Sequence, residues 1–333
     1  MSFEDVVLLE ERRSVSALIG LLYSDVSPVV KMAAMEALGR LGDTSAIGLL
    51  IEALDSDEPR ASEAASYALA KIGNPAVPAL IQSLKSPNSS IRKGAVVALG
   101  KIGDKRAIVP LIQALDDESG PVKHFAGIAL GNFPGDARVV EALIQSLEHG
   151  LHYVAAESLA KLECKEAVPH IILHLGSRRG GQHIGAAMGR ARMIRVLAKL
   201  GGPEIVKPLV DILPGAGRDI QWEVGKALGA LGPQILDQIL ALLKSKQWKR
   251  RLAGVSALKY MEELETIAED RVLDTLLITM WDQNKLIKRE SLNLLRRLKD
   301  PRLVQPLLRF IESDNHASFK EIATKMLDEL GAR

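Results

Sequence analysis

The stretch that decides the fold is Ile91-Arg92-Lys93-Gly94-Ala95-Val96-Val97-Ala98-Leu99-Gly100-Lys101-Ile102-Gly103-Asp104. Its apolar residues recur with the period of an α-helix, and its Gly-Asp ending is typical of a helix C-terminus followed by a new N-cap. The octet from Val77 to Leu84 lies before it and places apolar residues at i, i+3, i+4 and i+7. Together the two segments predict a hairpin of a short helix A and a longer helix B.

This hairpin recurs along almost the whole chain. The leading leucine of each helix B, which we use as the marker of its repeat, returns every 29 to 38 residues. The ten markers are Leu38, Leu69, Leu99, Leu130, Leu159, Leu197, Leu228, Leu258, Leu295 and Leu327. One hairpin cannot bury its own apolar faces, so the array depends on neighbour stacking. The sequence predicts an all-α protein, an α-α superhelix of about ten two-helix repeats.

The predicted organisation has an N-terminal capping segment over residues 1–13 and a single continuous solenoid over residues 14–333. Insertions are expected near residues 176–183 and 261–270, where the repeat period lengthens. Between repeats, glycines are expected to end helix B in the left-handed conformation and the next residue to cap the following helix. These pairs are Gly42-Asp43, Gly73-Asn74 and Gly103-Asp104.

The stretch from Ile91 to Asp104 resembles the short bacterial and archaeal HEAT repeats named after phycobilisome lyases. In that family an A helix with Pro-Leu-Ile-x-x-Leu precedes Val-Arg-x-x-Ala-Ala-x-Ala-Leu-Gly-x-Ile-Gly-Asp. The resemblance covers about residues 14 to 331 and implies a HEAT solenoid. It leaves function open, because the architecture hosts scaffolds, chromophore lyases, a di-iron hydroxylase and DNA glycosylases.

Composition and charge narrow the protein class. Hydrophobic residues make up 47%, aromatic residues 4% and charged residues 25%, with 43 Lys and Arg against 41 Asp and Glu. This composition indicates a folded chain and disfavours disorder or a wholly basic protein. Cys164 is the one cysteine, which excludes an internal disulfide or a CxxC site. The acidic N-terminus lacks a leader pattern and no run is long enough to span a bilayer, so a cytoplasmic location is expected.

Charge is distributed unevenly along the chain. Residues 1–165 carry 16 Lys and Arg against 21 Asp and Glu, whereas residues 166–333 carry 27 against 20. Residues 167–203 contain no acid, and they include Arg178 and Arg179 in a glycine-rich loop as well as Arg190 and Arg192. Such a loop before a helix could hold an anionic group, although a tolerated insertion is the more common explanation.

A second basic feature recurs seven residues before the markers. This register holds Lys31, Ser62, Arg92, Lys123, His152, Arg190, Gln221, Arg251, Lys288 and Lys320. One interpretation is a positive ladder that follows an acidic ligand. The favoured interpretation is structural: these side chains bond acidic or amide groups in the loop between helices A and B, such as Asp25, Asp57, Asn88 or Glu118.

Repeats seven and eight combine basic and indole side chains. Lys249, Arg250 and Arg251 follow Trp248, and Trp222 lies near the start of helix B in repeat seven. This combination occurs both in nucleic-acid sites and in protein-binding hot spots. Protein binding is favoured, because the acidic loops Asp55 to Glu58 and Asp116 to Glu118 would repel a polyanion along the first half.

The sequence contains no recognisable catalytic constellation. Five histidines, His149, His152, His170, His174 and His183, cluster near Cys164. His170 and His174 are spaced i, i+4 and could share a metal, but no acidic residue between 167 and 203 completes a recognisable site. Only His124 matches the His-Glu pairs of the di-iron relatives, and it lacks the Glu. No nucleophile-elbow, zincin, Walker or dinucleotide fingerprint occurs. We therefore expect no catalytic residue, no metal and no cofactor.

The leading functional hypothesis is a non-enzymatic scaffold or adaptor that binds a protein partner, with an acidic surface, through the concave face of repeats six to eight. Its candidate contacts are Arg178, Arg179, Arg190, Arg192, Trp222, Trp248, Lys249, Arg250 and Arg251. The resemblance implies a first alternative, a tetrapyrrole (bilin) lyase-type subunit acting on a phycobiliprotein. A second alternative is nucleic-acid binding through the basic C-terminal half. No membrane contact is expected, and the sequence predicts no oligomeric state.

Overall fold

The computed structural model describes residues 2–56, 58–148, 152–176, 184–262, 264 and 270–332. Within these ranges the regular structure is helical and no strand occurs. Helices follow one another as A and B partners, as the sequence predicts, and they divide into two compact units that meet between His170 and Ile171.

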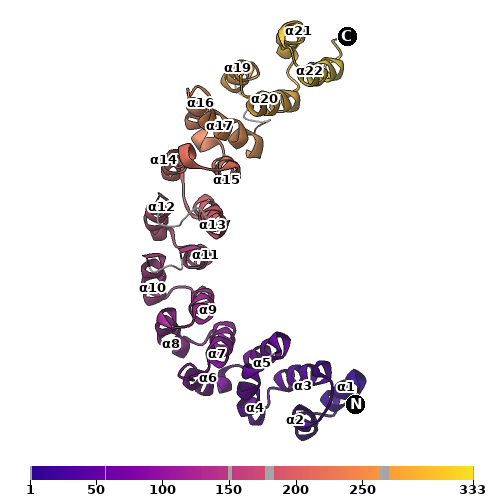
Figure 1. Ribbon diagram of the computed structural model, residues 1–333, viewed down its shortest axis with the longest axis vertical. Helices are drawn as coiled ribbons and strands as arrows, with labels where there is room; N and C mark the ends of the chain where they lie inside the picture. Colours follow the sequence, from indigo (N-terminus) through magenta and orange to yellow (C-terminus); the bar gives the residue numbers. More distant parts are fainter. Residues whose placement is uncertain are drawn as a thin grey trace. The chain divides into compact units, whose positions relative to one another are not determined.

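The first unit stacks five hairpins in two layers (Figure 1). Helix α1 (Phe3–Glu11) packs on α2 and α3 at the start of the stack. The A layer contains α2 (Val15–Tyr23), α4 (Ile47–Glu52), α6 (Val77–Ser83), α8 (Ile108–Gln113) and α10 (Ala137–Glu148). The B layer contains α3 (Pro28–Leu41), α5 (Pro59–Ile72), α7 (Ser89–Ile102), α9 (Gly120–Leu130) and α11 (His152–Lys161).

The second unit continues the same alternation. Its A layer contains α12 (Val168–Gly176), whose first turn belongs to the first unit, and then α14 (Val206–Asp211), α16 (Leu236–Leu243), α19 (Asp270–Thr279) and α21 (Val304–Ser313). Its B layer contains α13 (Ile184–Leu200), α15 (Arg218–Ala230), α17 (Trp248–Tyr260), α20 (Lys285–Leu298) and α22 (Ala317–Glu329).

Short 3₁₀ turns flank many of the A helices. They are η1 (Thr44–Ala46), η2 (Ala53–Asp55), η3 (Asn74–Ala76), η4 (Lys105–Ala107), η5 (Ala114–Asp116), η6 (Lys165–Ala167), η7 (Pro203–Ile205), η8 (Leu213–Gly215), η9 (Pro233–Ile235) and η10 (Pro301–Leu303). No helix in the described part of the chain combines the length and apolar character needed to cross a membrane.

The marker leucines form the centre of the core. All ten are at most 1% exposed, which confirms the predicted repeat register. Neighbouring B helices approach closely beside them: a Cβ added at Gly100 would lie 2.5 Å from Cβ of Ala129 in the next repeat. Small residues next to the markers therefore set the spacing of the B layer.

The predicted pairs of a glycine helix end and a following cap are confirmed at two of the three positions. Gly42, Gly73 and Gly103 all have positive φ, from 70° to 79°. The carboxylates of Asp43 and Asp104 accept the backbone N–H two residues later, at 2.9 and 2.8 Å. The cap predicted for Asn74 is wrong, because Pro75 belongs to a turn in which the Ala76 N–H donates to the carbonyl of Gly73 instead.

The single continuous solenoid remains a prediction. The two predicted insertions fall largely outside the described residues, which leave out 177–183, 263 and 265–269. In the predicted capping segment, α1 is tied to the first repeat by hydrogen bonds from Arg40 to Glu10 at 2.6 and 2.7 Å.

Candidate functional site

Arg92 belongs to the basic register seven residues before the markers, and its side chain bonds within the protein. Its Nη1 donates to the carbonyls of Ser86 and Pro87, at 2.8 and 3.1 Å, in the loop before its own helix. Its Nε and Nη2 donate to Asp117 of the next repeat at 2.8 and 2.9 Å, and Nη2 also reaches Glu118 at 3.0 Å. The side chain is 7% exposed, so Arg92 joins two repeats internally.

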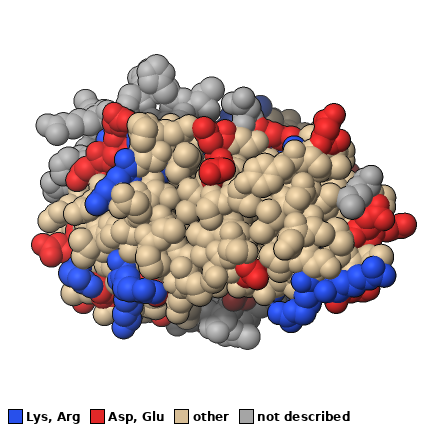
Figure 2. Space-filling model, turned by 90° about the horizontal axis from the view of Figure 1, so that it is seen from below, with Lys and Arg blue, Asp and Glu red and all other residues tan. Residues whose placement is uncertain are grey.

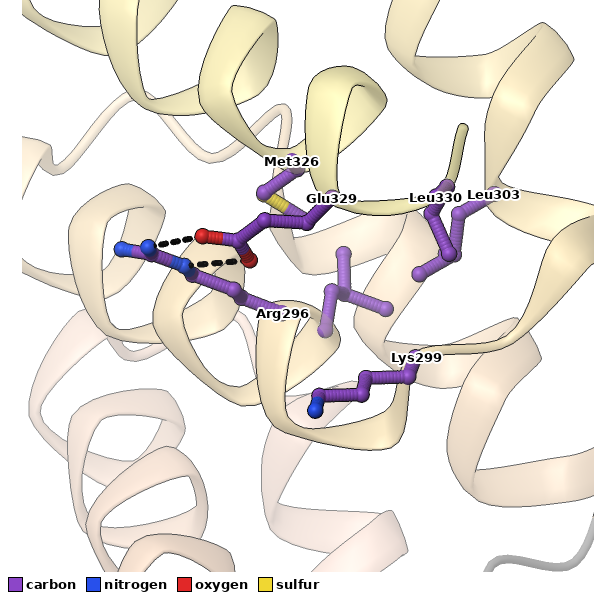
Figure 3. Close-up of a pocket in the computed structure, with 7 residues that line it drawn as sticks. Arg296, Lys299, Leu303, Met326, Glu329 and Leu330 are labelled. Carbon is purple, nitrogen blue, oxygen red and sulfur yellow. Dashed lines mark hydrogen bonds and ion pairs between the residues drawn. The ribbon is translucent and has the colours of Figure 1, made fainter. Parts of the chain in front are cut away.

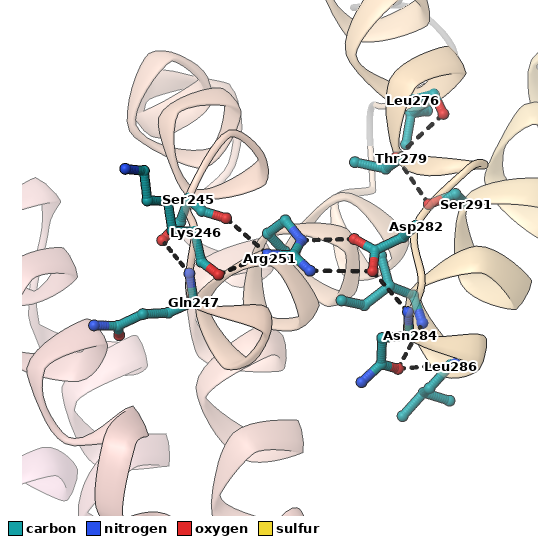
Figure 4. Close-up of polar contacts among 11 residues, drawn as sticks. Ser245, Lys246, Gln247, Arg251, Leu276, Thr279, Asp282, Asn284, Leu286 and Ser291 are labelled. Carbon is teal, nitrogen blue, oxygen red and sulfur yellow. Dashed lines mark hydrogen bonds and ion pairs between the residues drawn. The ribbon is translucent and has the colours of Figure 1, made fainter.

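Arg251 repeats this geometry in the second unit (Figure 4). It donates to the carbonyls of Ser245 and Lys246 at 2.8 and 3.1 Å, and to both carboxylate oxygens of Asp282 at 2.6 and 3.1 Å. The hydrogen bond to Asp282 raises the pKa of Arg251. Lys288 makes the corresponding contact with Asp314 of the last repeat.

The structural interpretation of this register is therefore confirmed at Arg92, Arg251 and Lys288. No side chain of the register is exposed among those that the structure describes. The acceptor needs one correction: Asp117, one residue before the expected Glu118, makes the bidentate contact. Asp117, Asp282 and Asp314 each also accept a backbone N–H at 2.8 Å, two residues later, which fixes the carboxylate for its neighbour.

A different register carries the exposed basic residues. Two residues after the marker, the chain places Arg40, Lys71, Lys101 and Lys161 in the first unit and Lys199 and Arg297 in the second. All six are exposed. The sequence signal for this register is the Lys of the Leu-Gly-Lys-Ile-Gly pattern in repeat three, two residues after the marker.

The predicted contact residues of α13 and its preceding loop are only partly described. Arg178 and Arg179 lie outside the described residues. Arg190 and Arg192 are half-buried in α13, and both take part in interactions within the chain. The acid-free loop therefore stays a prediction.

Trp222 lies at the centre of a compact mixed cluster in the B layer of the second unit. We call this cluster the Trp222 surface; it consists of Arg195, Trp222, Glu223, Lys226, Lys259 and Tyr260. The Tyr260 ring meets the indole edge-on, with centroids 5.8 Å apart. The Lys259 ammonium lies 4.9 Å from the indole centroid and donates to Glu290 at 2.8 Å. The cluster thus joins α15, α17 and α20.

Cations and carboxylates alternate around this indole. Arg195 and Lys226 form ion pairs with Glu223 at 3.6 and 3.7 Å. Trp222, Lys226, Lys259 and Tyr260 are all half-buried. The arrangement presents a preorganised aromatic and basic surface whose charges are largely balanced, rather than a strongly positive field.

The other predicted residues of repeat eight face its junction with repeat seven. Lys249 donates to the carbonyls of Pro214 and Ala216 at 2.8 and 3.1 Å. Arg250 lies 3.8 Å from Asp211, and its buried Nε has no hydrogen-bond partner. Trp248 is 43% exposed at the start of α17. Trp248 is therefore the member of this group that is most available to a partner.

Two concave features occur in the described parts of the units. A cavity of about 10 Å³ between α20 and α22 has the Arg296–Glu329 ion pair in its lining (Figure 3). It has room for about one water molecule. A larger groove of about 620 Å³ lies between α10 and α12; Glu141, Glu166 and His170 are on its rim, with Val140 and Ile144 as apolar lining.

No group of three His, Cys, Asp or Glu side chains in the described part of the chain could hold a metal ion. His170 is exposed in the groove, and His149, His183 and the side chain of His152 lie outside the described set. Cys164 is buried and donates to Glu166 at 3.3 Å. Burial raises the pKa of this thiol, and the bond to Glu166 raises it further, which disfavours a reactive thiolate.

Charge is interspersed on the face shown in Figure 2, where uncharged residues prevail and acidic and basic side chains alternate around the margin. That face offers no continuous basic track of the kind that a polyanion follows.

Comparison with known proteins places the chain in a family. A family model described as HEAT repeats matches residues 7–70 and 49–122. A phycocyanobilin lyase subunit beta from Nostoc sp. is 30% identical over 151 residues, which are 41% of this chain and 76% of that protein. The chain belongs to the phycobilisome-lyase-like HEAT-repeat family. A phycocyanobilin lyase subunit alpha from Picosynechococcus sp. is also 30% identical, over 42% of this chain and 59% of its own length.

Solved structures support the same fold for this HEAT-repeat protein. The structure of Kap121p bound to Ste12p covers 95% of this chain with a TM-score of 0.67 and 15% identity, using 41% of its own length. Importin beta in an ammonium sulfate condition covers 99% with a TM-score of 0.54 and 15% identity, using 54% of its length. At this identity the likeness concerns the fold alone.

Proposed function

We propose that this HEAT-repeat protein is a non-enzymatic scaffold or adaptor that binds a protein partner through the B layer of its second unit, chiefly repeats six to eight. The observation that carries the proposal is the Trp222 surface, where an indole is held by Tyr260 and Lys259 within a rim of charged groups. Half-buried aromatic anchors surrounded by polar groups are characteristic of protein-binding hot spots.

The partner surface is expected to be acidic. Lys259 lies over the indole, and Arg195 and Lys226 pair with the neighbouring Glu223. Glu223 and Glu290 offset part of this charge, so electrostatics should set orientation and association rate while the aromatic anchor dominates affinity. Arg251 is left out of the proposed contact surface, since its donors are bound to Asp282 and to the carbonyls of its own loop.

Nucleic-acid binding is less favoured at this surface for a geometric reason. A stacking site for an unpaired base needs an open aromatic face. At Trp222, the Lys259 ammonium lies over the indole ring and Tyr260 packs against it in a T-shaped arrangement, so a base would compete with both for this ring. Two carboxylates near the cations would also repel phosphates.

Affinity capture tests the proposal directly. The immobilised wild type, Trp222→Ala and the control Ile278→Ala would be incubated with extract of the source cells, and co-purifying protein, nucleic acid and pigment would be quantified. Ile278 is 67% exposed on an A helix. We expect a protein retained by the wild type and Ile278→Ala but lost with Trp222→Ala. Retention of nucleic acid or pigment alone would contradict the proposal. A cytoplasmic location is part of it and would be tested by cell fractionation.

A bilin lyase-type role is the second candidate, supported by the relatives named as phycocyanobilin lyase subunits. Guanidinium and ammonium groups of the B layer could pair with the carboxylates of a tetrapyrrole. Titration with phycocyanobilin, followed by visible absorption, tests binding. Addition of an apo-phycobiliprotein and mass analysis of the product tests transfer. A covalent bilin adduct that forms only with this protein present would favour the lyase role over the adaptor.

A further inference from the structure

The B layer of the first unit carries a second organised surface, distinct from the Trp222 surface. Two residues before the markers, three consecutive repeats place Tyr67, Val97 and Ile128 on α5, α7 and α9. Tyr67 and Ile128 are each 45% exposed, and Val97 is half-buried. Four residues further along lies a polar row, with Lys71, Lys101 and Lys161 in the last turns of α5, α7 and α11 and Asn132 in the turn just after α9. We call the two rows the lysine strip; its members are Tyr67, Val97, Ile128, Lys71, Lys101, Asn132 and Lys161.

Contacts between repeats hold the strip together. The Lys101 ammonium of α7 lies 3.9 Å from the centroid of the Tyr67 ring on α5. Asn132 donates to the carbonyl of Gly100 at 2.8 Å, and Lys161 donates to the Asn132 side chain. Tyr67, Lys101, Asn132 and Lys161 thus contact a neighbouring repeat, and the two rows run across the helices rather than along one of them.

The charge of the strip contrasts with that of its surroundings. Residues 1–165 carry a net charge of −5, yet Lys71, Lys101 and Lys161 are exposed in one row. A cation in the last turn of a helix is favoured by the helix dipole. The dipole does not account for the apolar row one turn earlier, in which Tyr67 and Ile128 are exposed and Val97 is half-buried. The pairing of the two rows therefore points to a ligand.

The spacing of the rows indicates the form of that ligand. Helices in contact stack about 8–10 Å apart, which is close to the length of about three residues of extended chain at roughly 3.3 Å each. On α5 and α7 the two rows are four residues apart, or about 6 Å at 1.5 Å per residue. This strip is narrower than the roughly 10 Å diameter of an α-helix and matches an extended chain.

We propose that the lysine strip binds an extended, acidic segment of a partner protein, with an apolar side chain at every third position and carboxylates beside it. The apolar side chains lie against Tyr67, Val97 and Ile128, and the carboxylates face Lys71, Lys101 and Lys161. This contact uses the first unit alone and is independent of the proposed role of Trp222.

Synthetic peptides of defined pattern test this surface. Fluorescein-labelled (Leu-Glu-Pro)₄ forms an extended helix of three residues per turn, and its anisotropy would be followed against the full-length protein at low ionic strength. The comparison peptides are (Leu-Lys-Pro)₄, (Ser-Glu-Pro)₄ and a helical peptide with leucines seven residues apart flanked by Glu. We expect (Leu-Glu-Pro)₄ to bind most tightly and its affinity to fall with salt.

Matched variants locate the site. Lys71→Gln/Lys101→Gln should weaken binding of (Leu-Glu-Pro)₄ by roughly fivefold or more, from the loss of two exposed ion pairs. Ile128→Ser tests the apolar row and should weaken it to a similar extent. Lys105→Gln/Lys165→Gln removes the same charge from exposed positions in η4 and η6 and should leave binding unchanged. The proposal would be overturned by equal losses of affinity in both double variants. Tighter binding of the helical peptide, or no preference for the acidic peptide, would also overturn it.

Discussion

Arg92 in α7 and Asp117 in the loop before α9 form a bidentate ion pair, with N–O distances of 2.8 and 2.9 Å, across the junction of repeats three and four. Arg251 and Asp282 reproduce the same pair in the second unit. Both arginines also hold two carbonyls of their own loop. The basic register of Arg92 and Arg251 thus ties the loops of neighbouring repeats together, whereas the basic residues nine positions later are exposed.

Substitution of Arg92 should reveal this internal role. Arg92→Gln leaves the carboxylate of Asp117 buried without its cation, and we expect a loss of about 3 kcal/mol in the free energy of unfolding. Lys101→Gln removes an exposed cation from the same helix and should cost less than about 0.5 kcal/mol. Urea denaturation followed by circular dichroism measures both values. Similar costs for the two variants would show that Arg92 is not a tie between repeats.

The pH dependence of stability should carry the signature of Asp117. Burial raises the pKa of this carboxyl, but hydrogen bonds from Arg92 and from the N–H of Ser119, with the charges of Arg92 and Lys123, outweigh burial and lower it below 3.8. A lowered pKa stabilises the folded state fully above the unfolded-state value, and that stabilisation is lost as pH falls through the folded-state value. Asp117→Asn should therefore show a shallower loss of stability below about pH 4 than the wild type. The exposed Asp116→Asn should keep the wild-type slope.

Gly100 should tolerate no added methyl group. A Cβ there would lie 2.5 Å from Cβ of Ala129 and 2.8 Å from its Cα, so Gly100→Ala must push α7 away from α9. We expect a loss of about 1–3 kcal/mol, despite the higher helix propensity of alanine. Gly20→Ala, at a helix position with nothing within 4 Å of the added Cβ, should instead stabilise by up to about 1 kcal/mol. Thermal melts of both variants decide whether the steric contact of the added methyl group or the helix propensity of alanine determines the change in stability.

The marker leucines should behave as core residues. Leu99 is fully buried, and Leu99→Ala should cost about 2–5 kcal/mol through the cavity that it leaves. A loss well below about 1 kcal/mol would contradict the repeat register on which the fold prediction rests.

Repeat periodicity was sufficient to predict the fold, because each helix depends on the same few positions. The marker leucines, Gly42, Gly103 and the caps at Asp43 and Asp104 all lie as the local pattern requires. Asn74 differs because the proline after it changes the turn, a local effect that the repeat consensus does not include.

The surfaces were harder to predict, because a charge in a repetitive sequence does not reveal which way it faces. The sequence favoured internal bonding for Arg92 and Arg251 but left an exposed ladder open, and their contacts with Asp117 and Asp282 decide between the two. The exposed lysines at Lys71 and Lys101 lie in a motif that was examined only for its glycines. Trp222 was found from its residue type, but its contacts with Lys259 and Tyr260 join separate repeats and have no sequence signal.

The most direct test of the central claim is a calorimetric titration of the captured partner against the wild type, Trp222→Ala and Lys226→Ala at low and physiological salt. If the Trp222 surface is a protein-binding hot spot, Trp222→Ala should weaken binding by about thirtyfold or more, equivalent to about 2 kcal/mol, and Lys226→Ala by much less. If each lost cation weakens binding equally with a steep salt dependence, while Trp222→Ala has no effect, the account is contradicted.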